Sequence, residues 1–306
     1  MALQNGRNYI TVEKIGSLSD PRGGPLYLTY AGSRPEDIKI QVRVRTDAWE
    51  MPVLELSDWY DRTERDRKDT IRTYVQELTA WVESLEQAGI TGSSLKNSIR
   101  NATEIATPSV LLSLPADQVL SGLRGVGNDE DAMVSAMYQN VLAWEEELFV
   151  ANKVQGILDS DAALSDYRYP MTTRQNIRYM RMFAGAFMYA AGNHIGVEYG
   201  STAALVQGKP SAALAEGERE NGLFGWGIAH EIGHNMDKLG KAETTNNLYS
   251  LFLQAWDGGA MKLSTRLTEE NRWEAIFNKV AQGRPGVANN VFVQLGMYWH
   301  IHFVHP

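Results

Sequence analysis

The most informative segment of the sequence is residues 225–237, which read Gly-Trp-Gly-Ile-Ala-His-Glu-Ile-Gly-His-Asn-Met-Asp. It contains the pattern H-E-x-x-H. On an α-helix, a spacing of four residues brings His230 and His234 to one face, about 6 Å apart along the axis. Two imidazole nitrogens so placed can bind one zinc ion, and Glu231 beside them is positioned as a general base toward a water on the metal. The alternative, a solvated helix face, is disfavoured because apolar residues flank the motif.

A catalytic zinc site usually has three protein ligands and an open fourth position. Asp237 is a poor third ligand, because it lies almost a full helical turn beyond His234. Glu243 is the better candidate, since Gly240 breaks the first helix and residues 242–256 are predicted to form a second helix that starts near the metal. A carboxylate there also suits the positive end of the helix dipole. The alternative is that Glu243 is an ordinary carboxylate at a helix start.

The beginning of the chain has the pattern of β-strands. Apolar and polar residues alternate over residues 38–45, and strands are also predicted at 25–30 and 53–56. Such alternation is typical of an antiparallel sheet with one buried and one wet face. We therefore predict that residues 1–62 form a β-rich part with a mostly antiparallel sheet.

After residue 62 the apolar residues recur at helical spacing. Helices are predicted at residues 64–88, 129–151 and 174–191. Residues 200–225 are rich in Gly, Ala and Ser and are predicted to be a loop, either near the site or on the plain surface. Strands first and helices after indicate an α+β fold. Residues 63–306 would be the mainly helical part with the zinc site, within one catalytic domain that is either compact or a fragment of a larger protein.

Composition excludes several classes of protein. The chain has no cysteine, which excludes disulfide scaffolds, cysteine-ligated zinc fingers, iron–sulfur sites and thiol nucleophiles. Its net charge of −8 argues against a general nucleic-acid binder, because such proteins present basic surfaces to phosphate. No run of about 18 apolar residues occurs, so no membrane-spanning segment is predicted. The first residues also lack the pattern of a secretory signal.

Two segments together resemble the enhancin-like peptidases, metallopeptidase family 60. They are residues 230–235, His-Glu-Ile-Gly-His-Asn, and residues 243–247, Glu-Thr-Thr-Asn-Asn. The family pattern is HExxH, a variable gap, and a glutamate in a TE-x-TNN setting. Here Ala242 replaces the threonine before the glutamate and Thr244 fills the next position, and neither change affects a ligand.

The resemblance extends beyond the metal motif. Residues 23–28 are similar to the GG-x-hydrophobic-Tyr strand of the family, and residues 188–196 are similar to its Met-x-Ala-Gly-Tyr-x-Ile segment. The similarity therefore spans about residues 23–300, and its most specific part is residues 225–250.

The resemblance implies a zincin-like metallopeptidase domain and a secreted or cell-surface endopeptidase of the gluzincin type. Its partner would be a mucin or another O-glycosylated protein as substrate. By the motif match, one Zn²⁺ is bound by His230, His234 and Glu243, and Glu231 is the general base. Two alternatives stay open: a zinc peptidase with no glycan requirement, and a non-catalytic glycoprotein-binding module on the same fold.

Other polar residues are candidates for supporting roles. The oxyanion needs a donor besides the metal, and the C-terminal run offers Tyr298, His300 and His302, although strand residues without a catalytic role are the simpler interpretation. Three asparagines can orient zinc-bound histidines or can instead cap helices and form turns: Asn235, Asn246 and Asn247. Trp226 either stacks on substrate or packs in the core.

Overall fold

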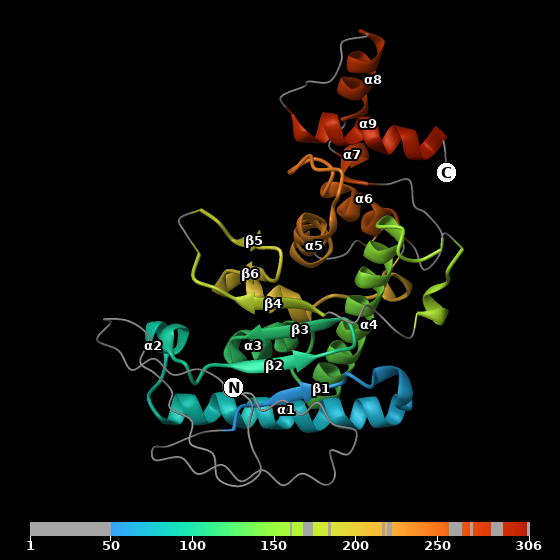
Figure 1. Cartoon of the computed structure of the whole chain (residues 1–306). Coiled ribbons are helices and arrows are strands. Elements are labelled where there is room, and N and C mark those ends of the chain that lie inside the picture. The colour runs from blue at the N-terminus through green and yellow to red at the C-terminus, as the bar shows by residue number, and fades with distance from the viewer. Residues whose placement is uncertain are drawn as a thin grey trace, which may run out of the picture.

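The computed structural model describes residues 50–159, 161–167, 174–182, 185–215, 218, 222–256, 265–269, 272–282 and 290–304. Within these residues the fold is one six-stranded sheet with helices around it (Figure 1). The strands are β1 (Val53–Glu55), β2 (Thr103–Ala106), β3 (Val110–Leu114), β4 (Gln175–Tyr179), β5 (Met188–Ala190) and β6 (Ile195–Val197).

Helices make up most of the remaining described structure. The α-helices are α1 (Glu64–Gln87), α2 (Gly92–Asn97), α3 (Ala116–Val126), α4 (Glu130–Val154), α5 (Ala229–Met236), α6 (Asn247–Ala255), α7 (Arg266–Glu269), α8 (Trp273–Ala281) and α9 (Val291–Val304). Short 3₁₀ helices lie at Trp59–Asp61, Leu164–Asp166, Tyr199–Val206 and Ser211–Ala213, and a π-helix lies at Gly222–Ile228. In the described part of the chain, every helix is too short or too polar to cross a membrane.

The sheet is mixed, with the strand order β1-β2-β3-β4-β6-β5. Strands β1 and β2, β3 and β4, and β4 and β6 pair in parallel, whereas β2–β3 and β5–β6 are antiparallel. The described sheet is therefore mixed and lies mostly after residue 63, with only β1 before it, whereas the mostly antiparallel sheet predicted within residues 1–62 falls largely on residues outside the described ranges. The alternation rule missed the later strands because they are short and because β2 is buried along its whole length.

Part of the N-terminal prediction cannot be compared with the structure. The strand predicted at 53–56 is confirmed as β1. The strands predicted at 25–30 and 38–45 lie outside the described residues. The α+β class is confirmed by the described elements, and the division of the catalytic domain at residue 62 stays a prediction.

The two longest helices confirm the predicted helical periodicity. Helix α1 begins with a reciprocal cap between Thr63 and Asp66 and is followed by Gly89, whose φ of 73° suits a left-handed helix terminus. The apolar stripes of both helices are buried in one core with the sheet: Ile71, Val75, Leu78 and Val82 on α1, and Met133, Met137, Val141, Trp144 and Leu148 on α4. Leu85, at the end of the α1 stripe, is also buried. These stripes are core packing, as their spacing predicted.

Residues 174–191, predicted as a helix, contain β4 and β5 instead. Gly185 lies between the two strands with φ of 85°, and Gly192 follows β5 with φ of 74°. These left-handed positions suit turns and interrupt a helix. Ile177 at the centre of β4 is fully buried, and β4 pairs with β3 on one side and β6 on the other. The helix prediction was wrong because sheet packing outweighed the local apolar pattern.

Residues 200–225 are more regular than the predicted loop. The 3₁₀ helix at Tyr199–Val206 buries Leu205 in the core, and the Leu205 carbonyl accepts hydrogen bonds from Asn140 at 3.0 Å and Trp144 at 3.1 Å. The π-helix at Gly222–Ile228 then leads directly into α5. The 3₁₀ helix packs on α3 and α4, and Phe224 of the π-helix contacts Trp144 of α4, which local composition does not reveal.

The C-terminal run around Tyr298 was predicted as a strand and is part of α9, so this prediction was wrong. Leu295 and Trp299, four residues apart, are buried together with Leu251 and Ala255 of α6 in a second, smaller core. The aromatic composition favours a strand, but burial at helical spacing overrides that preference. Helix α6, which was predicted to follow the metal motif from residue 242, begins five residues later, at Asn247.

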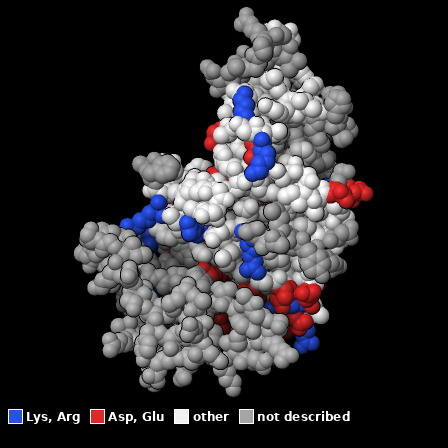
Figure 2. Space-filling model, viewed as in Figure 1, with Lys and Arg blue, Asp and Glu red and all other residues white. Residues whose placement is uncertain are grey.

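The order of the strands places α5 at one edge of the sheet. In Figure 1 the sheet extends from β1, near α1, to β5, near α5, and helices α6 to α9 continue beyond that edge. Figure 2 shows basic and acidic side chains scattered among uncharged ones on the same face of the molecule. The metal motif therefore lies between the sheet edge and the C-terminal helices.

Gly122 tests the packing of α3 on the 3₁₀ helix at 199–206. A Cβ at this position would lie 2.4 Å from the Ala203 carbonyl oxygen and 2.6 Å from Val206 Cγ2. Because backbone cannot move aside, Gly122→Ala should lower the free energy of unfolding in urea by about 1–3 kcal/mol, despite the better helix propensity of alanine. Ser121, the exposed residue next to Gly122, provides the control. Ser121→Ala should change the free energy of unfolding by no more than about 0.5 kcal/mol. Wild-type stability in Gly122→Ala would contradict this close contact.

Candidate metal centre

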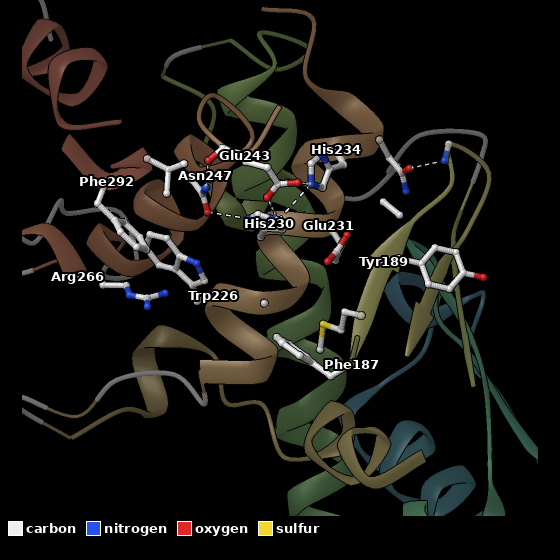
Figure 3. Close-up of a pocket in the computed structure, with 16 residues that line it drawn as sticks. Phe187, Tyr189, Trp226, His230, Glu231, His234, Glu243, Asn247, Arg266 and Phe292 are labelled. Carbon is white, nitrogen blue, oxygen red and sulfur yellow. Dashed lines mark hydrogen bonds and ion pairs between the residues drawn. The ribbon is translucent and has the colours of Figure 1, made fainter. Parts of the chain in front are cut away.

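A cleft of about 720 Å³ opens over α5 and contains the predicted metal ligands. His230 and His234 project into it from α5, and Glu243 reaches in from the turn that follows (Figure 3). One side of the cleft is formed by β5 and the residues next to it, and the other side includes Trp226 and Phe292. The cleft is thus open to solvent between the sheet edge and an aromatic wall.

The three predicted ligands converge on one point. The Nε2 atoms of His230 and His234 lie 3.2 Å apart. One carboxylate oxygen of Glu243 is 3.3 Å from His230 Nε2, and the other is 3.2 Å from His234 Nε2. One ligand atom from each residue can be chosen so that all lie within 4.8 Å of one another. Two imidazole nitrogens and one carboxylate oxygen form a donor set that suits zinc.

Glu243 reaches the histidines from a turn and not from a helix start. Its backbone is left-handed, with φ of 62°, which is unusual for a residue other than glycine. Gly240, just before it, has φ of 75°. Helix α6 begins only at Asn247. The predicted proximity to the metal site is thus produced by an irregular turn, and the predicted helix at Glu243 was wrong.

Asp237, rejected above as a ligand, instead stabilises this turn. Its carboxylate accepts hydrogen bonds from the Thr245 hydroxyl and from the Leu239 N–H. The Thr245 N–H donates to the Lys241 carbonyl at 2.9 Å. The Lys241–Thr245 bond is a single helical turn, and the left-handed backbone of Glu243 within it prevents a regular helix from starting at residue 242.

Gly233, inside the H-E-x-x-H motif, allows α5 to approach the turn. A Cβ on Gly233 would lie 2.3 Å from the backbone oxygen of Asn246. No side chain can occupy that space without moving the backbone of the turn. The position between the two histidines is therefore a contact point that determines how near Glu243 comes to them.

Glu231 lies in the same cleft beside the ligand cluster and is 7% exposed. Its carboxylate accepts a hydrogen bond from the Ala190 N–H of β5. Burial raises the pKa of Glu231 to about 7, with a further rise from the Glu243 carboxylate, while His230 and the Ala190 N–H act in the opposite direction. A carboxyl group that titrates near neutrality can both accept and donate a proton.

His234 is suited to metal binding in its neutral form. Its pKa is lowered, chiefly by burial and also by His230, although Glu243 opposes this shift. A neutral imidazole keeps the lone pair that a metal needs.

The far wall of the cleft is aromatic and carries a cation. The rings of Trp226 and Phe292 lie 6.0 Å apart, and the Arg266 guanidinium lies 5.0 Å from the first ring and 4.5 Å from the second. Such distances are typical of cation–π contacts. Arg266 and Phe292 were not identified from the sequence, because no motif marks them and they approach Trp226 only in the folded chain.

Comparison with protein families identifies the chain. The family model described as peptidase M60, enhancin and enhancin-like matches residues 93–304, which is most of the sequence. The chain belongs to this family. A comparison with curated proteins found no match.

Solved structures of M60 domains are similar to this M60 chain. The M60 catalytic domain of ZmpC from Clostridium perfringens, in complex with the sialyl T antigen, has 22% sequence identity and a TM-score of 0.49; the match covers 74% of this chain and 36% of that chain. The ZmpB metallopeptidase from the same organism gives the same identity, coverage and TM-score. A functionally unknown conserved protein from Bacillus anthracis has 22% identity and a TM-score of 0.45, with 74% and 40% covered. The chain spans about a third of the length of the first two.

Two of the three predicted oxyanion donors of the C-terminal run do not line the cleft. Tyr298 and His300 are not among the described residues that line the cleft, and the His300 ring lies 6.0 Å from Phe277 of α8. The side chain of His302 lies outside the described residues. The roles of His230, His234 and Glu243 as ligands, and of Glu231 as a base, stay predictions that the geometry supports.

Substitution of Gly233 tests whether this contact determines the position of Glu243. In Gly233→Ala the new methyl group meets the Asn246 backbone, so the turn should shift and zinc affinity should fall toward that of Glu243→Gln, which loses a carboxylate oxygen directly. Competition with a chromophoric chelator measures the affinity. Gly222→Ala is the control, because a Cβ there meets no atom within 4 Å. Tight zinc binding in Gly233→Ala would show that the contact does not control the third ligand.

Proposed function

We propose that this M60 chain carries the catalytic domain of a zinc-dependent endopeptidase that hydrolyses peptide bonds in mucin-like, O-glycosylated proteins. The observation that carries the proposal is the convergence of His230, His234 and Glu243 in an open cleft, with the buried carboxylate of Glu231 beside them. A helix with H-E-x-x-H and a later glutamate is the arrangement of a gluzincin within a zincin-like domain. The donor set fits one zinc ion, and the cleft leaves a side open for substrate.

Glu231 supplies the proton transfers in this proposal. A bound zinc ion would lower the pKa of a water molecule and polarise the scissile carbonyl. Glu231 accepts a proton from the attacking water and returns it to the leaving amine. The Ala190 N–H holds the Glu231 carboxylate near strand β5, on the side of α5 where the cleft is open.

Among the described strands, β5 lies at the edge of the sheet, and its outer side offers a place for the substrate backbone. The Phe187 carbonyl accepts a hydrogen bond from the Glu198 N–H, and the Ala191 N–H donates one to the His194 carbonyl. The backbone groups of every second residue, starting with Phe187, therefore face β6. Met188 and Ala190 therefore direct their backbone groups away from β6, and the Ala190 N–H points to Glu231. An extended peptide that pairs with this edge passes directly beside the general base.

The aromatic wall supports the glycan part of the proposal. Trp226 and Phe292 line the cleft opposite β5, and aromatic rings offer flat apolar faces to sugars as well as to peptide side chains. The substrate class itself comes from the resemblance to the enhancin-like family. The same resemblance supports a secreted or cell-surface location, where mucins occur.

Glu231→Gln tests the general base. The variant should retain one zinc ion per chain and the wild-type fold, and its cleavage rate should fall by a factor of about 10² or more, since an amide cannot accept the proton. Elemental analysis measures the zinc, and mucin digestion measures the rate. Glu83→Gln on the exposed face of α1 should behave as wild type. Undiminished cleavage by Glu231→Gln would remove Glu231 from the mechanism.

A pair of matched peptides tests the substrate class. We expect cleavage of an O-glycosylated peptide and not of the same peptide after enzymatic removal of its glycans, with chelation abolishing the reaction and zinc restoring it. Mass spectrometry of the products gives the cleaved bond. Equal cleavage of both peptides would favour a zinc peptidase with no glycan requirement. Retention of the glycopeptide without cleavage would favour the binding module.

A further inference from the structure

Asn247, the first residue of α6, contacts two of the three ligand residues. Its Oδ1 lies 2.8 Å from His230 Nδ1, and its Nδ2 donates a hydrogen bond to the backbone carbonyl of Glu243 at 2.9 Å. The side chain is almost fully buried, with 4% of the residue exposed. A single amide group therefore bridges the first histidine of the motif and the turn that presents the carboxylate.

The Glu243 contact determines which way the Asn247 amide faces. A carbonyl oxygen can only accept a hydrogen bond, so the NH₂ group of Asn247 must face Glu243. The amide oxygen must then face His230 Nδ1. Because an amide oxygen can only accept, the geometry requires a proton on Nδ1 of His230, and in the neutral ring Nε2 is then the nitrogen left for a metal. The Glu243 carboxylate, 3.3 Å from Nε2, acts in the opposite direction, since it would accept a proton placed there.

Asn246 contacts the same ring nitrogen and would favour the opposite tautomer. Its Nδ2 lies 3.2 Å from His230 Nδ1, and an amide nitrogen can only donate. Donation to Nδ1 would need a lone pair there and would place the proton on Nε2, where it blocks a metal. The Asn246 amide has another acceptor, the His230 backbone carbonyl at 3.3 Å, which is compatible with a proton on Nδ1. The shorter contact of Asn247 thus selects between two tautomers.

The same amide also supports the unusual backbone of Glu243. This residue has φ of 62°, a conformation that residues other than glycine rarely adopt. Its side chain is 62% exposed, so burial of the side chain does little to hold it in place. The hydrogen bond from Asn247 to its carbonyl ties the turn to the start of α6.

We propose that Asn247 is a positioning residue that links the metal-binding tautomer of His230 to the left-handed turn at Glu243. The inference rests on the proposed zinc site and deepens it, since it identifies the group that prepares two ligands for the ion. The inference does not depend on whether the protein cleaves peptides. It is tested by metal binding and by the state of one imidazole ring.

The tautomer of His230 in the metal-free wild-type protein is the first test. Two-bond ¹H–¹⁵N correlation spectra distinguish a proton on Nδ1 from one on Nε2, and His230→Gln assigns the signal. We expect the proton on Nδ1, although free histidine in water favours Nε2. A proton on Nε2 in the wild type would overturn the proposal, whatever the variants show.

Two substitutions at Asn247 distinguish control of the His230 tautomer from a purely structural role of the Asn247 side chain. Asn247→Leu keeps a similar shape and loses both hydrogen bonds, so the Nδ1–H signal should be lost and zinc affinity should fall about 10–100-fold. Asn247→Asp keeps the acceptor for His230 and should keep the Nδ1–H signal. Thermal unfolding of the metal-free proteins is measured alongside, because a purely structural role would lower stability and leave the tautomer and the zinc affinity of the folded protein unchanged. Lower stability with an unchanged tautomer and unchanged zinc affinity would contradict the proposal.

Asn235 is the matched control within the same cleft. It directly follows the metal motif, but its side-chain oxygen accepts a hydrogen bond from the Gly192 N–H at 2.8 Å, and its amide nitrogen approaches Gln175. Among the described contacts, its side chain meets none of the three proposed metal ligands. Asn235→Leu should keep the His230 tautomer, because Asn235 makes no contact with that ring in the described residues, and should lower zinc affinity less than Asn247→Leu does. An equal loss of affinity in Asn235→Leu and Asn247→Leu would refute a specific role for Asn247. Absence of peptidase activity in a wild type that binds zinc would count against the proposed function alone.

Discussion

The site depends on the close approach of α5 to the turn before α6. At Gly233 the two segments are so near that an added Cβ would lie 2.3 Å from the backbone oxygen of Asn246. This contact brings the Glu243 carboxylate within 3.2–3.3 Å of both imidazole Nε2 atoms. The H-E-x-x-H motif thus depends on Gly233 as well as on its histidines and its glutamate, because the proposed third ligand, Glu243, comes from another segment.

The rest of the fold holds this contact in place from two sides. Strand β5 meets α5 through the Ala190 N–H, which bonds to Glu231, and through the Gly192 N–H, which bonds to Asn235. On the other side, α6 packs on α9 in the smaller core around Leu251 and Trp299. The metal helix is therefore held between a sheet edge and a helical layer, and the cleft between them stays open. A hydrolytic site needs this combination of rigid ligands and an accessible edge.

The sequence predicted long periodic helices well and short strands poorly. Helices α1 and α4 have apolar stripes over many turns, and their burial follows from helical geometry alone. Strands β4 and β5 are five and three residues long, and they form because neighbouring strands complete their hydrogen bonds. Helix α9 was mistaken for a strand for a related reason, since Leu295 and Trp299 are buried against α6 only in the folded chain. Segments whose conformation depends on partners distant in sequence are beyond a local pattern.

By itself the sequence determined the local chemistry: His230, Glu231 and His234 lie on one helix at a spacing that brings both imidazoles to one face, and this follows from 3.6 residues per turn. It also placed Glu243 as the candidate third ligand. The folded chain was needed to show that Glu243 reaches the histidines from a left-handed turn and that Asn247 is the asparagine whose oxygen faces His230. The physical reason is that a helix orders residues through their nearest neighbours in the chain, whereas the turn, the Asn247 bridge and the β5 edge exist only through contacts between separate segments.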